Sequence, residues 1–121
     1  MIKVENEQHR QAILTANVKQ NQNAMALGVC VASYEEARGD VLRACYGKPE
    51  YAHRLGARVH EFEGQKAFLL ETIRRTQAEQ RGAGEAALRG LGLDPAKGDY
   101  TLDLASWVVH KLVGGKWEPN F

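Results

Sequence analysis

Two matched apolar repeats on either side of one turn constrain the fold of this chain more than any other feature. Before the turn, apolar residues recur at steps of three, four and seven residues: Ala24, Leu27, Val31, Tyr34, Val41 and Cys45. After it they recur in the same way at Ala52, Leu55, Val59, Phe62, Leu69 and Ile73. Heptad spacing on both sides of a turn is typical of two long helices folded back on each other. The pattern therefore predicts a mainly α-helical protein built on a long, antiparallel, coiled-coil-like helical hairpin.

The turn itself is Gly47-Lys48-Pro49-Glu50. Gly47 suits the left-handed position just past a helix end, and Pro49 suits the first turn of the next helix. We therefore expect a first helix over about residues 5–46, which Gly39 or the polar residues 21–23 could interrupt. The second helix is expected to begin at Pro49 and to end or bend where Gly82-Ala83-Gly84 begins.

The C-terminal third predicts smaller elements. Residues 85–91 resemble a short third helix, and residues 94–98 resemble a turn. In the tail, alternating apolar residues from Tyr100 to Leu104 and the Gly114-Gly115 pair favour a small β-hairpin, although residues 104–112 also fit one helical face. We expect residues 1–83 to form the hairpin and residues 84–121 to form a C-terminal cap within the same domain.

A turn centred near residue 48 predicts which positions face each other across the two helices. The apolar pairs are Cys45 with Ala52, Tyr34 with Phe62, Leu27 with Leu69, and Ala24 with Ile73, and the polar pairs are Gln20 with Thr76 and Asn17 with Gln80. Two cations, Arg38 and Lys66, also fall on this seam. Arg38 can reach Glu61 or Glu63, and Lys66 can reach Glu35. Alternatively, both side chains extend along apolar surface with their charges in water, or they contact an acidic partner.

Composition excludes several classes of protein. The net charge is +1, with 16 basic and 15 acidic residues, which is not the strongly positive field of a dedicated nucleic-acid binder. No apolar run approaches the roughly 20 residues that a membrane span needs, and no secretory signal is evident. Cys30 and Cys45 are too far apart on one helix to form a disulfide within the chain, so both should be small buried residues in a reducing compartment. A disulfide between two chains is the alternative. We expect a cytoplasmic protein, or part of a particle assembled in cytoplasm.

The residues do not predict an enzyme. The four histidines form no zinc-binding pattern, because His53 and His60 lie about 10 Å apart with no ligand between them. Neither serine stands in a nucleophile motif, and no glycine-rich phosphate loop is present. We therefore expect no catalytic residues, no metal and no cofactor.

Two helices alone leave apolar residues uncovered, including Val29, Tyr51, Phe68 and Leu70. The C-terminal segment, a second copy of the chain or another protein must cover them, and we expect at least one of the last two. The candidate partner-binding residues are the exposed apolar and cationic ones near the turn and tail: Tyr51, Arg54, Arg58, Phe68, Trp107 and Trp117. For the two tryptophans, packing of the tail onto the hairpin is the competing interpretation.

The tail carries a resemblance of limited extent. A helical hairpin followed by Gly92-Leu93-Asp94-Pro95, then residues 99–104 and Trp107-Val108-Val109, resembles small phage- or prophage-encoded proteins over about 30 residues. The chain departs from that pattern at Ala105-Ser106, where a tight-turn residue is expected. The resemblance implies a non-enzymatic protein-interaction module that self-associates or binds another protein, as a virion or assembly component or as an inhibitor of a host protein.

The alternative is a nucleic-acid-associated accessory protein. It would bind phosphates through a basic helix face formed by Arg54, Arg58, Arg74, Arg75 and Arg81.

Overall fold

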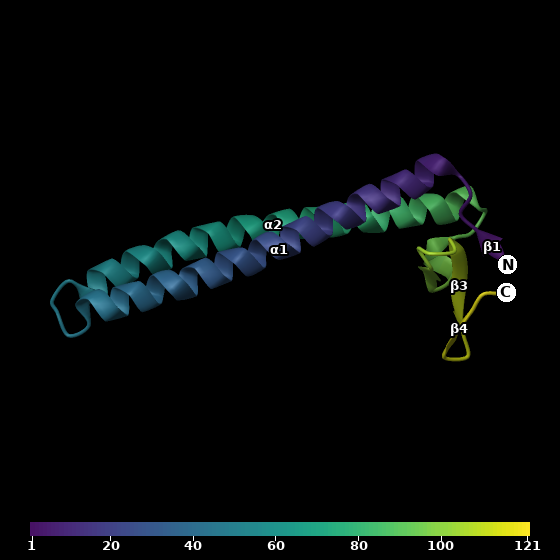
Figure 1. Cartoon of the computed structure of the whole chain (residues 1–121). Helices are drawn as coiled ribbons and strands as arrows, with labels where there is room; N and C mark the ends of the chain where they lie inside the picture. Colours follow the sequence, from purple (N-terminus) through teal and green to yellow (C-terminus); the bar gives the residue numbers. More distant parts are fainter. The chain divides into compact units, whose positions relative to one another are not determined.

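The computed structural model describes all residues from 1 to 121 and contains two long helices and a small antiparallel sheet (Figure 1). Helix α1 spans Glu7–Cys45 and helix α2 spans Tyr51–Gly90. The strands are β1 (Ile2–Lys3), β2 (Tyr100–Leu102), β3 (Val108–Val113) and β4 (Lys116–Glu118), with a 3-10 turn at Pro95–Lys97. The predicted helical hairpin and small β tail are therefore confirmed. No helix combines the length and the apolar character needed to cross a bilayer.

The chain divides into two compact units. Unit 1 consists of residues 1–18 and 77–121, and unit 2 consists of residues 19–76. Unit 2 contains the turn and the parts of both helices nearest to it, whereas unit 1 contains the sheet and the remaining helical segments. The two units are described separately below.

The ends of α1 follow from local chemistry. Asn6 precedes the helix, and its side-chain Oδ1 accepts the backbone N–H of His9 at 3.2 Å, which satisfies a donor of the first turn. The helix then continues to Cys45 through residues 21–23 and Gly39, so the interruptions considered from the sequence do not occur. Beyond its end, Gly47 adopts the predicted left-handed conformation with φ of 80°.

Helix α2 differs from expectation at both ends. It begins at Tyr51, so Pro49 lies in the turn before the helix and not in its first turn. At the other end, Gly82-Ala83-Gly84 remains helical, because Ala83 packs against the core of unit 1 and outweighs the low helix propensity of the glycines. The predicted short third helix over residues 85–91 is therefore wrong, since these residues continue α2 and only the 3-10 turn follows.

The stop signal of α2 is Gly92. This residue has φ of 79°, and its N–H donates to the carbonyl of Arg89 at 3.0 Å. The N–H of Leu93 donates to the carbonyl of Leu88 at 3.0 Å, and both leucines pack against the core of unit 1. These two bonds form a Schellman cap, which satisfies carbonyls that the last helical turn leaves open.

In unit 2, α1 and α2 run antiparallel and side by side (Figure 1). The predicted register is confirmed where the structure shows contacts. The rings of Tyr34 and Phe62 stack with centroids 4.3 Å apart, and the hydroxyl of Thr76 donates to Gln20 Oε1. The same register holds in unit 1, where Gln80 Nε2 donates to Asn17 Oδ1 at 2.8 Å.

The seam of α1 lies one residue away from part of the predicted stripe. Cys30 is buried, whereas Val31 is 41% exposed, because Cys30 points across to α2 and donates to Gln65 Oε1 at 3.7 Å. Arg38 is exposed and pairs with Glu35 of its own helix at 2.9 Å, so its predicted contacts with the glutamates of α2 are wrong. Lys66 is half-buried, and its Nζ lies 5.7 Å from the centroid of the Phe62 ring. This position agrees with the prediction that the Lys66 side chain extends along apolar surface.

The sheet of unit 1 has β3 at its centre. Strand β2 pairs with one edge of β3, and both β1 and β4 pair with the other, all antiparallel. The β3–β4 hairpin turns at Gly114 and Gly115, with φ of 58° and 82°, which are the values that a tight two-residue turn requires. The helical alternative for residues 104–112 is therefore wrong. Strand β1 was not predicted, because two residues carry no detectable periodicity.

The loop between β2 and β3 explains how the chain turns at Ala105-Ser106 without the tight-turn residue that was expected there. Asp103 Oδ1 accepts the N–H of Ala105 at 2.9 Å, and this bond, with one to Ser106, holds the pKa of the Asp103 carboxyl below its usual range. The chain then reverses through Trp107, which has φ of 60°, a conformation that costs a non-glycine residue about 1–2 kcal/mol. An Asx turn and a strained tryptophan thus replace the expected turn residue.

The core of unit 1 joins both ends of the chain. Its buried members are Val4, Ile13, Ala87 and Val109, from the N-terminal segment, both helices and β3. Around them pack partly buried apolar residues from β1, from α2 and from the segment after it: Ile2, Ala83, Leu88, Leu91, Leu93, Tyr100, Leu102 and Trp107. Unit 2 has four buried side chains, those of Cys30, Val41, Cys45 and Thr76, whereas unit 1 has six, because Ala16 and Val108 are buried there as well.

Candidate functional site

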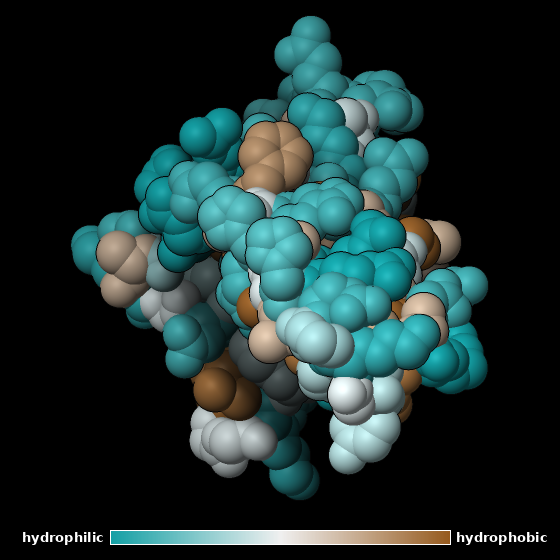
Figure 2. Space-filling view, turned by 90° about the vertical axis from the view of Figure 1, so that its left-hand side faces the viewer, coloured by the Kyte–Doolittle hydropathy of each residue, from teal (hydrophilic) through white to brown (hydrophobic).

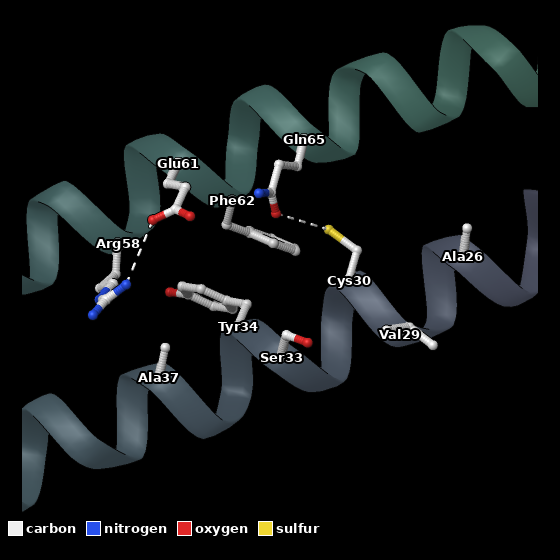
Figure 3. Close-up of a pocket in the computed structure, with 10 residues that line it drawn as sticks. All are labelled: Ala26, Val29, Cys30, Ser33, Tyr34, Ala37, Arg58, Glu61, Phe62 and Gln65. Atoms are coloured by element: carbon white, nitrogen blue, oxygen red, sulfur yellow. Dashed lines mark hydrogen bonds and ion pairs between the residues drawn. The ribbon is translucent and has the colours of Figure 1, made fainter.

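A shallow hollow of about 380 Å³ opens on one side of the helix pair in unit 2 (Figure 3). Helix α1 contributes mostly small side chains to its lining, and α2 contributes longer polar ones. The lining residues are Ala26, Val29, Cys30, Ser33, Tyr34, Ala37, Arg58, Glu61, Phe62 and Gln65. We call this side of unit 2 the groove face.

The floor of the hollow is formed by the stacked rings of Tyr34 and Phe62, and Cys30 points from α1 towards Gln65 on α2 (Figure 3). Arg58 and Glu61 form an exposed ion pair at 3.6 Å. The polar side chains of the hollow are therefore largely paired with one another. No histidine lines it.

Large apolar side chains stand exposed on and beside the groove face. Val29 lines the hollow and is 65% exposed, and Met25, one helical turn earlier, is 72% exposed. Phe68 lies three residues after Gln65 and seven after Glu61, so it continues the same stripe of α2, and it is 71% exposed. Exposure of this extent at three large apolar residues on one side of a helix pair is typical of an interaction surface.

The predicted site residues thus fall into separate places. Arg58 and Phe68 both belong to the groove face. Tyr51 lies at the turn, where its ring meets the exposed ring of Tyr46 edge-on at 5.8 Å. Arg54 is exposed one helical turn later. Seen from the turn end, the surface is mostly hydrophilic with isolated apolar residues (Figure 2).

Trp107 packs in unit 1. It lies against the core, and the guanidinium of Arg10 sits 5.3 Å from the centroid of its ring. Arg10 Nε also donates to the carbonyl of Val4 at 2.6 Å, and the carbonyl of Trp107 accepts the N–H of Val4 at 2.9 Å. These contacts hold the N-terminal segment against the tail, which is the packing role considered as the alternative for this residue.

Trp117 is 48% exposed on β4, opposite Leu112 of β3. Both line a second open hollow of unit 1, about 440 Å³, between the sheet and the end of α2. Its other lining residues are Arg81, Gly84, Glu85, Leu88, Pro95, Gly98, Asp99 and Tyr100. Trp117 therefore remains accessible, in contrast to Trp107.

The basic residues of α2 are mostly paired within the helix. Arg74 donates to both carboxylate oxygens of Glu71, at 2.7 and 3.0 Å, and these bonds hold the pKa of Glu71 below its usual range. Arg75 reaches the same carboxylate at 3.4 Å. With Arg58 paired to Glu61, these contacts weaken the positive field that phosphate binding by the helix face would use.

Sequence reasoning identified Val29 and Phe68 as apolar residues in need of cover but did not single out Met25 or Tyr46. The spacing of four residues between Met25 and Val29 is a signal that could have revealed the first of them. Nothing brings together three or more potential metal ligands. Comparison of the chain with protein-family models, with curated proteins and with solved structures finds no match.

Proposed function

We propose that this chain is a non-enzymatic protein-interaction module and that the groove face of unit 2 is its binding surface. The observation that carries the proposal is the exposure of Met25, Val29 and Phe68, between 65% and 72% each, on one side of the helix pair. Burying a large apolar side chain in an interface stabilises a complex by about 1.5–3 kcal/mol. Three such residues beside a shallow hollow form the apolar centre that protein interfaces commonly have.

The heptad-like burial of α1 supports the same proposal. In unit 2 one series of buried and half-buried positions follows steps of three and four residues: Asn23, Leu27, Cys30, Tyr34, Ala37, Val41 and Cys45. Gln20, Ala26 and Gly39 are half-buried beside this series. A packed helix pair buries one stripe of each helix and leaves the other faces open to further helices. The proposed biological roles are an assembly component of a phage-type particle or a small inhibitor that covers a host protein.

Site-specific photo-crosslinking tests the proposal. A benzophenone side chain at position 68 should give a saturable adduct of defined mass in native lysate, and the adduct should disappear when Met25 and Val29 are both changed to serine. The matched control is position 70, which is also exposed but lies two residues along α2 and therefore on another side of the helix. Equal adducts at both positions, or none at position 68, would refute the proposal.

A further inference from the structure

The groove face has a charge pattern that is complementary to itself. On α2, one stripe of the face runs through residues 61, 65, 68, 72 and 75, at steps of four and three. Phe68 stands at its centre, with Glu61 seven residues before it and Arg75 seven residues after it. If two such stripes lie antiparallel with their Phe68 residues in contact, each Glu61 comes opposite the Arg75 of the other copy. Within one copy these residues form only long, exposed ion pairs, Glu61 with Arg58 at 3.6 Å and Arg75 with Glu71 at 3.4 Å, which the contact between copies would replace or share.

The same axis passes through an apolar centre on α1. Tyr34 stacks on Phe62, so these two residues lie at the same level of the helix pair. Phe68 lies six residues after Phe62 on α2, and the residue at the same level of α1 is therefore six before Tyr34, which is Gly28. Because the helices are antiparallel, Val29 lies level with Phe68 to within one residue. A two-fold axis at this level brings Val29 to Val29 and Phe68 to Phe68, as a self-complementary interface requires.

The charges of α1 agree with this arrangement. Lys19 lies ten residues before Val29, and Asp40 lies eleven residues after it. The axis therefore brings Lys19 of one copy to within one residue of the level of Asp40 of the other copy. Small residues, Ala26 and Ser33, occupy the positions three before and four after Val29, where they allow two helices to approach closely. The apolar centre is thus flanked on both helices by opposite charges, which direct orientation more than they add affinity.

The alternative two-fold arrangement brings like charges together. With the axis along the helices, α1 of one copy would lie over α2 of the other at the same level. Glu61 would then come opposite Glu35, and Arg54 would come within one residue of Arg43. Like charges across an interface disfavour association, so the pattern selects the antiparallel arrangement. The net charge of +1 adds little general repulsion between copies.

From this pattern we infer that the partner on the groove face is a second copy of this chain, docked antiparallel about an axis through Val29 and Phe68. The inference rests on the proposed function, because it names the occupant of the same surface. In the dimer, Met25 of one copy lies level with Ser33 of the other, which lines the hollow. The exposed apolar centre is then covered by its own counterpart.

Charge reversal in the full chain tests the pairing, with mass and dimer affinity measured by sedimentation equilibrium. The unsubstituted chain should have twice the mass of one copy. Glu61→Arg and Arg75→Glu should each weaken the dimer about tenfold or more, because each creates two like-charge contacts. The double variant should restore the affinity to within about threefold. Glu63→Arg, an equal change of charge on the other side of α2, is the matched control and should have little effect.

Circular dichroism of each variant shows whether the helices remain formed, which separates loss of the dimer from loss of the fold. Orientation is tested by mild oxidation of single-cysteine substitutions beside the buried native cysteines. Phe68→Cys should form a disulfide-linked dimer. Arg54→Cys should not, because the two copies of residue 54 would lie roughly 40 Å apart. Cross-linking at position 54 but not at 68 would overturn the antiparallel arrangement.

Two further outcomes would also overturn the inference. One is a single-copy mass at every concentration, and the other is a double charge reversal that binds no better than the single variants. If the chain is a single copy while position 68 still cross-links specifically to a different protein, the second copy is excluded and the interaction module stands. If position 68 also gives no specific adduct, both proposals fail.

Discussion

The buried hydroxyl of Thr76 gives the sharpest stability prediction for the helix pair. Thr76 is 6% exposed, and its hydroxyl donates to Gln20 Oε1 and accepts from Asn23 Nδ2 at 3.3 Å. Thr76→Val keeps the shape of the side chain and removes both bonds between the helices. It leaves two half-buried amides without their partner, so the helix pair should lose stability.

The size of the effect follows from two opposing terms. Two neutral hydrogen bonds contribute about 1 kcal/mol each to the free energy of unfolding, or about 2 kcal/mol together. The methyl group that replaces the hydroxyl is buried in the seam and contributes about 0.8 kcal/mol in the opposite direction. The expected net loss is therefore about 1 kcal/mol, which corresponds to a fall in Tm of about 4 °C for a chain of this size.

Urea unfolding followed by circular dichroism measures this loss, with all variants compared at one protein concentration. Thr72→Val is the matched control, because the Thr72 hydroxyl donates only to the carbonyl of Phe68 on its own helix. A triple variant with Gln20→Leu, Asn23→Leu and Thr76→Val should be at least as stable as the natural chain, since no unpaired polar group remains. A fully stable Thr76→Val protein, or a triple variant less stable than Thr76→Val, would refute the reasoning.

Three further predictions concern the turn, the end of α2 and the tail. Gly47→Val should lower the free energy of unfolding by about 1 kcal/mol or more, because φ is 80° there, and an unchanged urea midpoint would contradict this. Gly84→Ala should raise Tm and add up to about 1 kcal/mol to the free energy of unfolding, because nothing lies within 4 Å of the added methyl group. Gly90→Ala should add less, since its methyl group would meet the ring of His9 at 2.6 Å. The lowered pKa of Asp103 means that its carboxylate stabilises the fold above about pH 4 and that this stabilisation is lost as the pH falls through the folded-state pKa. Asp103→Asn should reduce that acid sensitivity, and an NMR titration placing the Asp103 pKa at or above its usual value would contradict the prediction.

Local patterns were sufficient for the hairpin. The heptads and the Gly47 turn predicted both helices and their register, which the contacts Tyr34–Phe62, Gln20–Thr76 and Asn17–Gln80 confirm. The Gly114-Gly115 pair likewise predicted the β-hairpin of the tail. In each case the signal lies in residues close together in the chain, or in a repeat that one turn folds back on itself.

The candidate site was predicted only in part. Arg58 and Phe68 were expected to contact a partner and do lie on the groove face, whereas Trp107 is held by the core and Arg10 of unit 1. The sequence could not distinguish an exposed tryptophan from a packed one, because both tryptophans stand in short strand-like segments. Their burial depends on which elements cover them, and this is a property of the tertiary structure.

By itself, the order of residues determined that this chain forms two long helices, where they turn back and the register in which they face each other. Only the tertiary structure decided that α2 continues through Gly82-Ala83-Gly84, that Cys30 rather than Val31 enters the seam, and that residues 2–3 form a strand on β3. The physical reason is that helix periodicity and turn geometry are local properties. Packing against residues far away in the chain can outweigh a weak local preference of about 1 kcal/mol per residue.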